Sequence, residues 1–460
     1  MKRWIQSQEW AIRTCFMLMF LFGIVMSVMV PPWQVPDEET HVVLMGQGIC
    51  NSALEDVLFQ DMELDCYRIK SQPNEKVNVE QWKAAMTRKP GYDWKDCMPK
   101  GIRLSAVKHL PALAGMMLGI LMHLPTFWVL ELAEVFSLAF YVVVCWCAVK
   151  LMPVKKELLM LIMVFPMSLQ QASSVSYDAT LLPLCFLFLS YVICMRCQKE
   201  QLHWKEAVLT ILLLLVITYI KLPYALLGLL VFLLPKEKIQ LQLGKYEING
   251  DVIRRFRIPA GILLILVCGA VLYVVRSNFW VQLMWGMILE WKRSVLLFLT
   301  TAEIFHSFLM VSSVGQFGWL ESQLPLWFVR FTYLLMIVMA VWGRDRRIPN
   351  ELKGRAKLFL WIVFAMLSGM IALSMVNHMI MVTLYGTEAT TASYNLREAL
   401  YEIPYIGGIQ GRYFIPFLAL PFLGLPQKGR EVEWKIWIPS IYLVIAMTVT
   451  MRVLYFRYWG

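Results

Sequence analysis

Three consecutive acidic residues, Asp37, Glu38 and Glu39, come shortly after the first long apolar stretch of this chain. They belong to the run PPWQVPDEETH at 31–41, in which the prolines end the preceding helix and fix the direction of the chain after it. A carboxylate held there can act as a general base on a hydroxyl group or bind a divalent cation. His41, four residues after Asp37, would share a helix face with it. The alternative interpretation is a solvated loop that begins with turn-forming acids.

Four more polar segments stand at the ends of predicted apolar spans: SSVSYD at 173–178, KLPY at 221–224, QFGWLE at 316–321 and GGIQGRY at 407–413. Their cationic side chains can bind a phosphate group and stabilise its charge as it leaves. Their tyrosine rings can flank a sugar ring. The residues that we predict to line a common site are Asp37, Glu38, His41, Tyr177, Asp178, Lys221, Tyr224, Gln410, Arg412 and Tyr413.

Each of these segments also has an interpretation that needs no shared site. Lys221 can extend to the lipid headgroups, and Asp178 can cap the helix that follows it. Arg412 can anchor to lipid phosphate, and the glycines of 407–411 can provide loop flexibility alone. However, a charge in the membrane region costs roughly 2.5–3.5 kcal/mol on insertion scales. A common site becomes the better interpretation if all the segments lie on one face.

Composition places the chain among polytopic membrane proteins. Of its 460 residues, 59% are hydrophobic and 16% are charged, whereas soluble domains are about 45–50% apolar and about 25% charged. The formal net charge of +11 falls mostly in short loops between apolar runs. It therefore indicates membrane topology rather than nucleic-acid binding. The first apolar run is too long for a signal peptide and lacks a cleavage site before the prolines.

The sequence predicts an all-α protein that forms one integral membrane domain over 1–460, with its N-terminus in the cytoplasm and multiple passes through the cell membrane. The predicted spans, about eleven in number, are 11–30, 127–148, 157–175, 179–196, 206–220, 222–235, 259–276, 325–343, 358–385, 411–425 and 435–456. With this topology each linker rich in lysine and arginine lies on the cytoplasmic side. The segments that carry the predicted site then share the extracytoplasmic side.

Two longer blocks, 32–126 and 277–324, are predicted to be extracytoplasmic. The first contains an apolar stretch at 104–124, and a crossing there would invert every later loop. We therefore predict juxtamembrane or re-entrant helices in the first block. Its three cysteines permit one disulfide, and the sequence leaves the pairing open. They are Cys50, Cys66 and Cys97.

Five motifs carry a resemblance to a known family. The runs PPWQVPDEETH, SVSYDATLL, KLPY, FGWLE and GIQGRYFIP occur in this order and span nearly the whole chain. They resemble a bacterial family of uncharacterised membrane proteins, number 2142 among the domains of unknown function, which is similar to the GT-C glycosyltransferases. The resemblance implies a GT-C-like fold and a polyprenyl-phosphate sugar as donor. It also implies that Asp37 or Glu38 is catalytic, that Asp178 is the second acid, and that Lys221 and Arg412 contact the donor phosphate.

These groups suit the transfer of a sugar from a polyprenyl-phosphate donor to an extracytoplasmic cell-envelope glycan or lipid acceptor. The donor tail would lie between helices. Mg²⁺ or Mn²⁺ is the only cofactor that we predict, with Asp37 and Asp178 as its ligands. The alternatives are a transporter or flippase for such lipids and a non-catalytic scaffold for glycan assembly. A transporter needs charged groups along a path through the membrane, and the predicted spans contain few besides Glu131 and Glu134.

Overall fold

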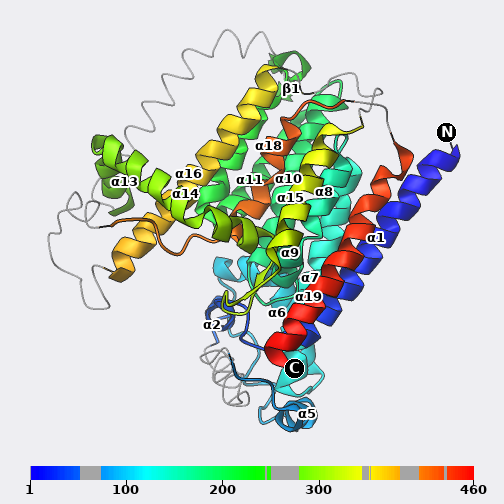
Figure 1. The fold of residues 1–460 in the computed structure, drawn as a ribbon, viewed down its shortest axis with the longest axis vertical. Helices are drawn as coiled ribbons and strands as arrows, with labels where there is room; N and C mark the ends of the chain where they lie inside the picture. Colours follow the sequence, from blue (N-terminus) through cyan, green and yellow to red (C-terminus); the bar gives the residue numbers. More distant parts are fainter. Residues whose placement is uncertain are drawn as a thin grey trace.

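The structure is a computed structural model and is mostly helical (Figure 1). It describes residues 2–51, 74–243, 246–249, 279–343, 352, 354–383, 403–428 and 432–460. The described part has two small antiparallel sheets, each with two strands. The pairs are β1 (Gln240–Leu243) with β2 (Tyr246–Asn249), and β3 (Gln316–Phe317) with β4 (Ser322–Gln323). The predicted all-α membrane protein is therefore confirmed at the level of its class.

Within the described residues, seven helical segments are long and apolar enough to cross a membrane. Each reaches at least 18 residues, close to the roughly 20 that a bilayer requires. The segments are formed by α1 (Lys2–Met29), η1 (Leu104–His109) with α6 (Leu110–Leu121), α7 (Thr126–Leu151), α10 (Asp178–Cys197), α14 (Trp291–Val314), α16 (Arg355–Thr383), and η5 (Glu433–Trp437) with α19 (Ile438–Tyr458).

The other predicted spans are shorter or broken. The stretch 157–175 forms two helices, α8 (Lys156–Met163) and α9 (Pro166–Ala172), since Pro166 has no N–H to continue the first helix. Both lie almost wholly inside the protein, where a broken helix is tolerated because no lipid touches its backbone. The remaining elements are α11 (Trp204–Ile220), η2 (Leu222–Leu233), η3 (Lys236–Lys238), α15 (Leu326–Val341), η4 (Gly411–Phe417) and α18 (Ala419–Leu423). The predicted span 259–276 lies outside the described residues, and the count of eleven stays a prediction.

The block at 277–324 is more helical than the sequence pattern indicates. It contains α13 (Phe279–Leu289) and α14, and α14 alone is long enough to cross a membrane. In Figure 1, α14 runs across α16 rather than along it. The extracytoplasmic placement of this block stays a prediction, and the apolar length of α14 does not favour it.

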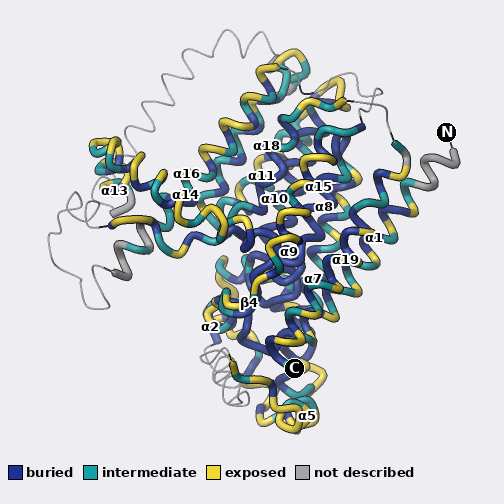
Figure 2. The backbone as a smooth tube through the Cα atoms, viewed as in Figure 1, coloured by how far each residue is buried: buried dark blue, intermediate teal, exposed yellow. Residues whose placement is uncertain are grey.

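Helices α1 and α19 lie side by side along one flank of the bundle, while α13 and α14 form the opposite flank (Figure 1). The most deeply buried backbone belongs to α8, α9 and α10, in the centre (Figure 2). The N-terminus and β1 lie at one end of the bundle. Helices α2 (Glu38–Gly48) and α5 (Val79–Thr87) lie at the other, which we call the site end.

The linkers predicted to share the N-terminal side contact one another in pairs. This arrangement is the one that the charge pattern requires, because those linkers must lie at a common level. The contacts are an ion pair between Glu9 and Lys150, hydrogen bonds from Lys155 to the carbonyl of Leu425 and from Lys435 to that of Trp342, and a bridge between Leu202 and Ile239.

The first polar block folds against the site end without a disulfide among its described residues. Asn51 Nδ2 donates to the carbonyls of Asp96, at 2.6 Å, and of Met98, at 2.9 Å, so the two halves of the block are held by hydrogen bonds. Cys50 and Cys97 are both free thiols. Cys66, the third candidate for a bridge, lies outside the described residues.

Candidate functional site

Asp37 and Arg412 face each other at the site end of the bundle. Asp37 precedes the first turn of α2 with φ at 68° and makes no capping hydrogen bond, so its carboxylate is free to face another element. Arg412 Nη2 lies 3.4 Å from Asp37 Oδ2. The Asp37 side chain is 60% exposed, whereas that of Arg412 is 4% exposed. An accessible acid therefore lies above a buried cation.

The guanidinium of Arg412 is incompletely satisfied. Its Nη1 donates to Gln171 Oε1 over a long 3.4 Å, and its Nε has no hydrogen-bond partner. A buried cation is costly unless its donors are paired. Unpaired buried donors in a native structure often mark a place for a ligand, ion or water. This guanidinium has donors left for one more anionic group, such as a phosphate.

Gly411 places Arg412 by allowing a close approach to α14. A Cβ atom on Gly411 would lie 2.1 Å from the Leu309 carbonyl oxygen and 2.4 Å from the Ser313 nitrogen. The Gly411 N–H donates to Ser312 Oγ at 2.7 Å. Only glycine fits there, so this glycine serves packing and not merely loop flexibility.

Lys221 forms the second cationic centre, at the joint between α11 and η2. Its Nζ lies 3.9 Å from Asp178 Oδ1 and 4.3 Å from the ring centre of Tyr413. The Tyr177 ring is 5.5 Å away. Lys221 thus lies against a carboxylate and two aromatic faces, an arrangement that stabilises a partly desolvated cation. Asp178 is the first residue of α10 and not its N-cap, a position held by Tyr177.

Tyr224 is buried and supports the site from behind. Its hydroxyl donates to the carbonyl of Tyr413 at 2.8 Å, and its side chain is 1% exposed. The predicted contact of Tyr224 with a sugar ring is therefore difficult to reconcile with its position. Its hydrogen bond instead fixes the backbone beside Arg412.

His41 is the centre of a buried polar cluster. Its Nδ1 lies 3.0 Å from His109 Nε2, and its Nε2 lies 3.3 Å from Ser176 Oγ. Its ring packs edge-on against Tyr177, with 4.6 Å between ring centres. Burial lowers the pKa of His41 to about 4, outweighing the opposite effect of the nearby carboxylates. The neutral imidazole can orient Tyr177 and Ser176 but carries no charge at neutral pH.

Glu38 is buried, whereas the neighbouring Asp37 is exposed to solvent. Its Oε2 accepts from the Trp33 N–H at 3.1 Å and its Oε1 accepts from the Val175 N–H at 3.2 Å. Burial raises the pKa of Glu38 to about 7, against the effect of these backbone donors. Glu38 thus ties the exit of α1 to the turn before α10. Of the two adjacent acids that were predicted as alternatives for the catalytic group, Asp37 is the one that a substrate can reach.

Five segments that are distant in sequence therefore come together at the site end: 37–41, 104–109, 171–178, 221–224 and 411–413. A sequence profile of the DUF2142 family, described as predicted membrane proteins, matches residues 20–421. The chain belongs to this family. Neither the curated proteins nor the solved structures contain a match to it.

The donor set of this DUF2142 protein is poorly suited to a metal ion. No group of three or more histidine, cysteine, aspartate or glutamate side chains that could hold one comes together in the described part of the chain. Asp37 and Asp178, the predicted ligands of Mg²⁺ or Mn²⁺, each already lie beside a cationic side chain. We therefore derive no chemical step that depends on a metal.

The structure adds residues to the site that the sequence analysis did not single out. Gln171 contacts Arg412, His109 contacts His41, and Ser176 joins His41 to the start of α10. Gln410, which was predicted, has a buried side-chain oxygen without a hydrogen-bond partner. Gln171 could have been predicted from the sequence, because it belongs to a pair of glutamines within an apolar run. A buried amide is costly unless it forms hydrogen bonds, so such a pair indicates a polar partner.

We expect Glu38→Gln to destabilise this DUF2142 protein by about 1–3 kcal/mol. The amide keeps one acceptor but turns an NH₂ group toward a backbone N–H, which leaves a buried donor unpaired. The check is the unfolding temperature of the purified variant, with Glu39→Gln as the control.

The same pair of variants also tests the pH dependence. Because the folded pKa of Glu38 lies above the ordinary value of 4.5, its contribution to stability is lost as pH rises from below 4.5 through about 7. The difference in unfolding temperature between wild type and Glu38→Gln should shrink over that interval. An equal difference in unfolding temperature at pH 4.5 and at pH 7 would contradict the raised pKa of Glu38.

Proposed function

We propose that this protein is a GT-C-like glycosyltransferase of the cell membrane. It moves a sugar from a polyprenyl-phosphate donor to a glycan or lipid of the cell envelope, on the extracytoplasmic side. The observation that carries the proposal is the exposed carboxylate of Asp37 above the buried, under-satisfied guanidinium of Arg412. A base and a phosphate-binding cation at one place are the two groups that this transfer requires.

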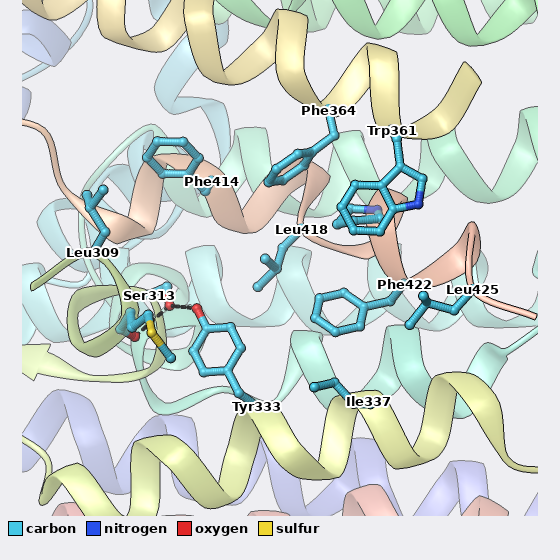
Figure 3. Close-up of a pocket in the computed structure, with 12 residues that line it drawn as sticks. Leu309, Ser313, Tyr333, Ile337, Trp361, Phe364, Phe414, Leu418, Phe422 and Leu425 are labelled. Carbon is cyan, nitrogen blue, oxygen red and sulfur yellow. Dashed lines mark hydrogen bonds between the residues drawn. The ribbon is translucent and has the colours of Figure 1, made fainter. Parts of the chain in front are cut away.

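An apolar groove of about 560 Å³ supports a lipid-linked donor (Figure 3). Rings and aliphatic side chains from α14, α15, α16 and the η4–α18 segment line it, among them Phe364, Phe414 and Phe422. At one end Ser313 Oγ lies 2.7 Å from the Tyr333 hydroxyl. Ser312, the neighbour of Ser313, binds Gly411. The groove thus begins next to the segment that carries Arg412 and can take the polyprenyl tail.

In the proposed reaction, Asp37 accepts the proton of an acceptor hydroxyl group. The acceptor oxygen forms a bond to the anomeric carbon while the bond from that carbon to the donor phosphate oxygen breaks. The electron pair goes to the leaving phosphate, whose negative charge Arg412 and Lys221 stabilise. Tyr413 lies against both cations, with its ring centre 4.3 Å from Lys221 Nζ and 5.3 Å from Arg412 Cζ. Tyr413 can therefore hold the two cations close enough together for both to contact the same donor molecule.

A transporter or flippase is the second candidate, because Glu131 and Glu134 are buried in α7. Such a protein would move the intact donor, whereas a transferase would cleave it. Measuring released polyprenyl phosphate after incubation of the purified protein with polyprenyl-phosphate sugars therefore separates the two, and a scaffold would release none.

The proposal requires the site end to face the outside of the cell. We expect a cysteine at position 95 to react with a membrane-impermeant maleimide in intact cells, and a cysteine at position 200 to react only after permeabilisation. Lys95 and Glu200 are both exposed, so reactivity reports on the side of the membrane and not on burial. The native cysteines must first be replaced. Labelling of position 200 in intact cells would reverse the orientation and remove the extracytoplasmic site.

A further inference from the structure

A second cleft, of about 840 Å³, lies at the site end and shares no lining residue with the proposed catalytic site. It is formed by four separate stretches: the segment just before 77, strand β4, the start of α15 and the last turns of α19. The β3–β4 hairpin lies between the two places, since Trp319 Nε1 donates to the Trp33 carbonyl at 3.1 Å. The cleft is therefore a distinct feature beside the first site.

The lining of this cleft is cationic. It includes Lys76, Arg452 and Arg457, and Glu321 is the only carboxylate among the described residues that line it. Arg457 Nε donates to Glu321 Oε1 at 2.6 Å, which neutralises that carboxylate. Lys76 donates to the carbonyl of Phe456, at the end of α19 where helix carbonyls lack partners. These contacts build a rigid base for the cleft and leave an excess of positive charge.

Arg452 is the cation that faces outward. It is exposed, and its Cζ lies 5.9 Å from the ring centre of Phe456, one turn further along α19. Its guanidinium can make two parallel hydrogen bonds to a phosphate. Arg457 and Lys76 already bind other groups of the protein. Arg452 is therefore the cation that is available for a ligand.

Two exposed aromatic side chains place the cleft at the level of lipid headgroups. Trp327, at the start of α15, is 61% exposed, and Phe456 is 57% exposed. Exposed tryptophans at the ends of membrane helices are typical of the interface between hydrocarbon and water. A ligand in this cleft would have a polar group beside Arg452 and an apolar part beside the two rings.

We propose that this cleft binds the phosphate headgroup of an anionic phospholipid. Arg452 holds the phosphodiester, and the acyl chains descend past Trp327 between the outer faces of α15 and α19. The site is independent of the proposed sugar transfer, and it would persist if that activity were absent. A bound anionic lipid would contact both the β3–β4 hairpin and α19. It would thereby stabilise the hairpin, whose Trp319 contacts Trp33 beside the candidate site.

The test is native mass spectrometry of the purified full-length protein titrated with phosphatidylglycerol, with zwitterionic phosphatidylcholine in a parallel series. We expect Arg452→Gln to weaken phosphatidylglycerol binding about tenfold, which is the usual size of one charge-assisted hydrogen bond. Phosphatidylcholine has the same phosphodiester but also a choline cation, so it should bind wild type more weakly than phosphatidylglycerol and lose less affinity in Arg452→Gln. Trp327→Ala should also weaken phosphatidylglycerol binding, by removing the apolar contact.

Arg330→Gln is the matched control, because Arg330 is an exposed cation on α15 that does not line the cleft. Equal phosphatidylglycerol binding by wild type and Arg452→Gln would overturn the proposal. An equal loss in Arg330→Gln would overturn it too, by showing a general effect of surface charge. Soluble glycerol phosphate should compete only weakly. Complete displacement of the lipid by glycerol phosphate at matched concentrations would instead assign the cleft to a soluble phosphate compound.

Discussion

Asp37→Asn is expected to lower the rate of sugar transfer by about 10²–10⁴-fold, the usual contribution of general acid–base catalysis. Asparagine keeps the size of aspartate but cannot accept the proton of the acceptor hydroxyl. The fold should survive, because the Asp37 side chain is mostly exposed and its contact with Arg412 is long. The measurement is the single-turnover rate with saturating donor, alongside the unfolding temperature of the same preparation.

Glu39→Gln is the control for Asp37→Asn, since it removes the same charge two residues further along α2. It should retain most of the transfer activity. The double variant Asp37→Asn/Glu38→Gln should be no more active than Asp37→Asn alone. Full activity in Asp37→Asn would exclude this carboxylate from the mechanism, and full activity in the double variant would exclude the acidic run as a whole.

Arg412→Ala and Lys221→Ala are each expected to weaken donor binding by about tenfold to 150-fold. This range corresponds to the loss of a charge-assisted hydrogen bond worth about 1.5–3 kcal/mol. Binding of a polyprenyl-phosphate sugar to the purified variants can be measured directly, without turnover. Arg412→Lys should recover part of the affinity, because it restores the charge but not the planar pair of donors.

Lys108→Ala provides a matched comparison for these variants. Lys108 also lies over a tyrosine ring, with its Nζ 5.2 Å from the ring centre of Tyr219, but it has no carboxylate partner among the ion pairs of the described residues. Donor affinity should be unchanged in this control. Unchanged affinity in both Arg412→Ala and Lys221→Ala would show that these cations serve only to contact lipid headgroups or to stabilise the fold.

The convergence of distant segments could be predicted because the membrane makes isolated charges costly. Asp178 and Lys221 lie in an otherwise apolar part of the chain, and each needs an opposite charge nearby. The charge pattern of the linkers placed both residues at the same end of the bundle as Asp37. Paired contacts among the basic linkers at the opposite end agree with this topology.

Side-chain direction could not be predicted in the same way. Asp37 and Glu38 are adjacent and chemically similar, yet one is exposed and the other is enclosed by two backbone donors. That difference depends on how the exit of α1 packs against the turn before α10. Tyr224 likewise lies behind the site because its hydroxyl reaches the Tyr413 carbonyl, a contact across 189 positions of the chain.

Helix breaks were predictable only in part. Pro166 lies within an apolar stretch of normal span length, and periodicity alone does not show that α8 and α9 are separate. The break brings Gln171 to Arg412. The short segments η2 and η4 adopt tighter helices than the expected spans, and their turns present Lys221 and Arg412 to the site. These breaks in the helices therefore position side chains of the candidate site.

The most direct test of the account is whether the purified protein cleaves a polyprenyl-phosphate sugar. The protein in lipid nanodiscs should be incubated with a panel of such donors and a cell-envelope glycan extract, and free polyprenyl phosphate and glycosylated acceptor should be quantified by mass spectrometry. We predict that one donor yields both products in equal amounts with wild type, and that Asp37→Asn yields at least a hundredfold less of both. Wild-type protein that carries an intact labelled donor across a bilayer while releasing no polyprenyl phosphate would contradict the account.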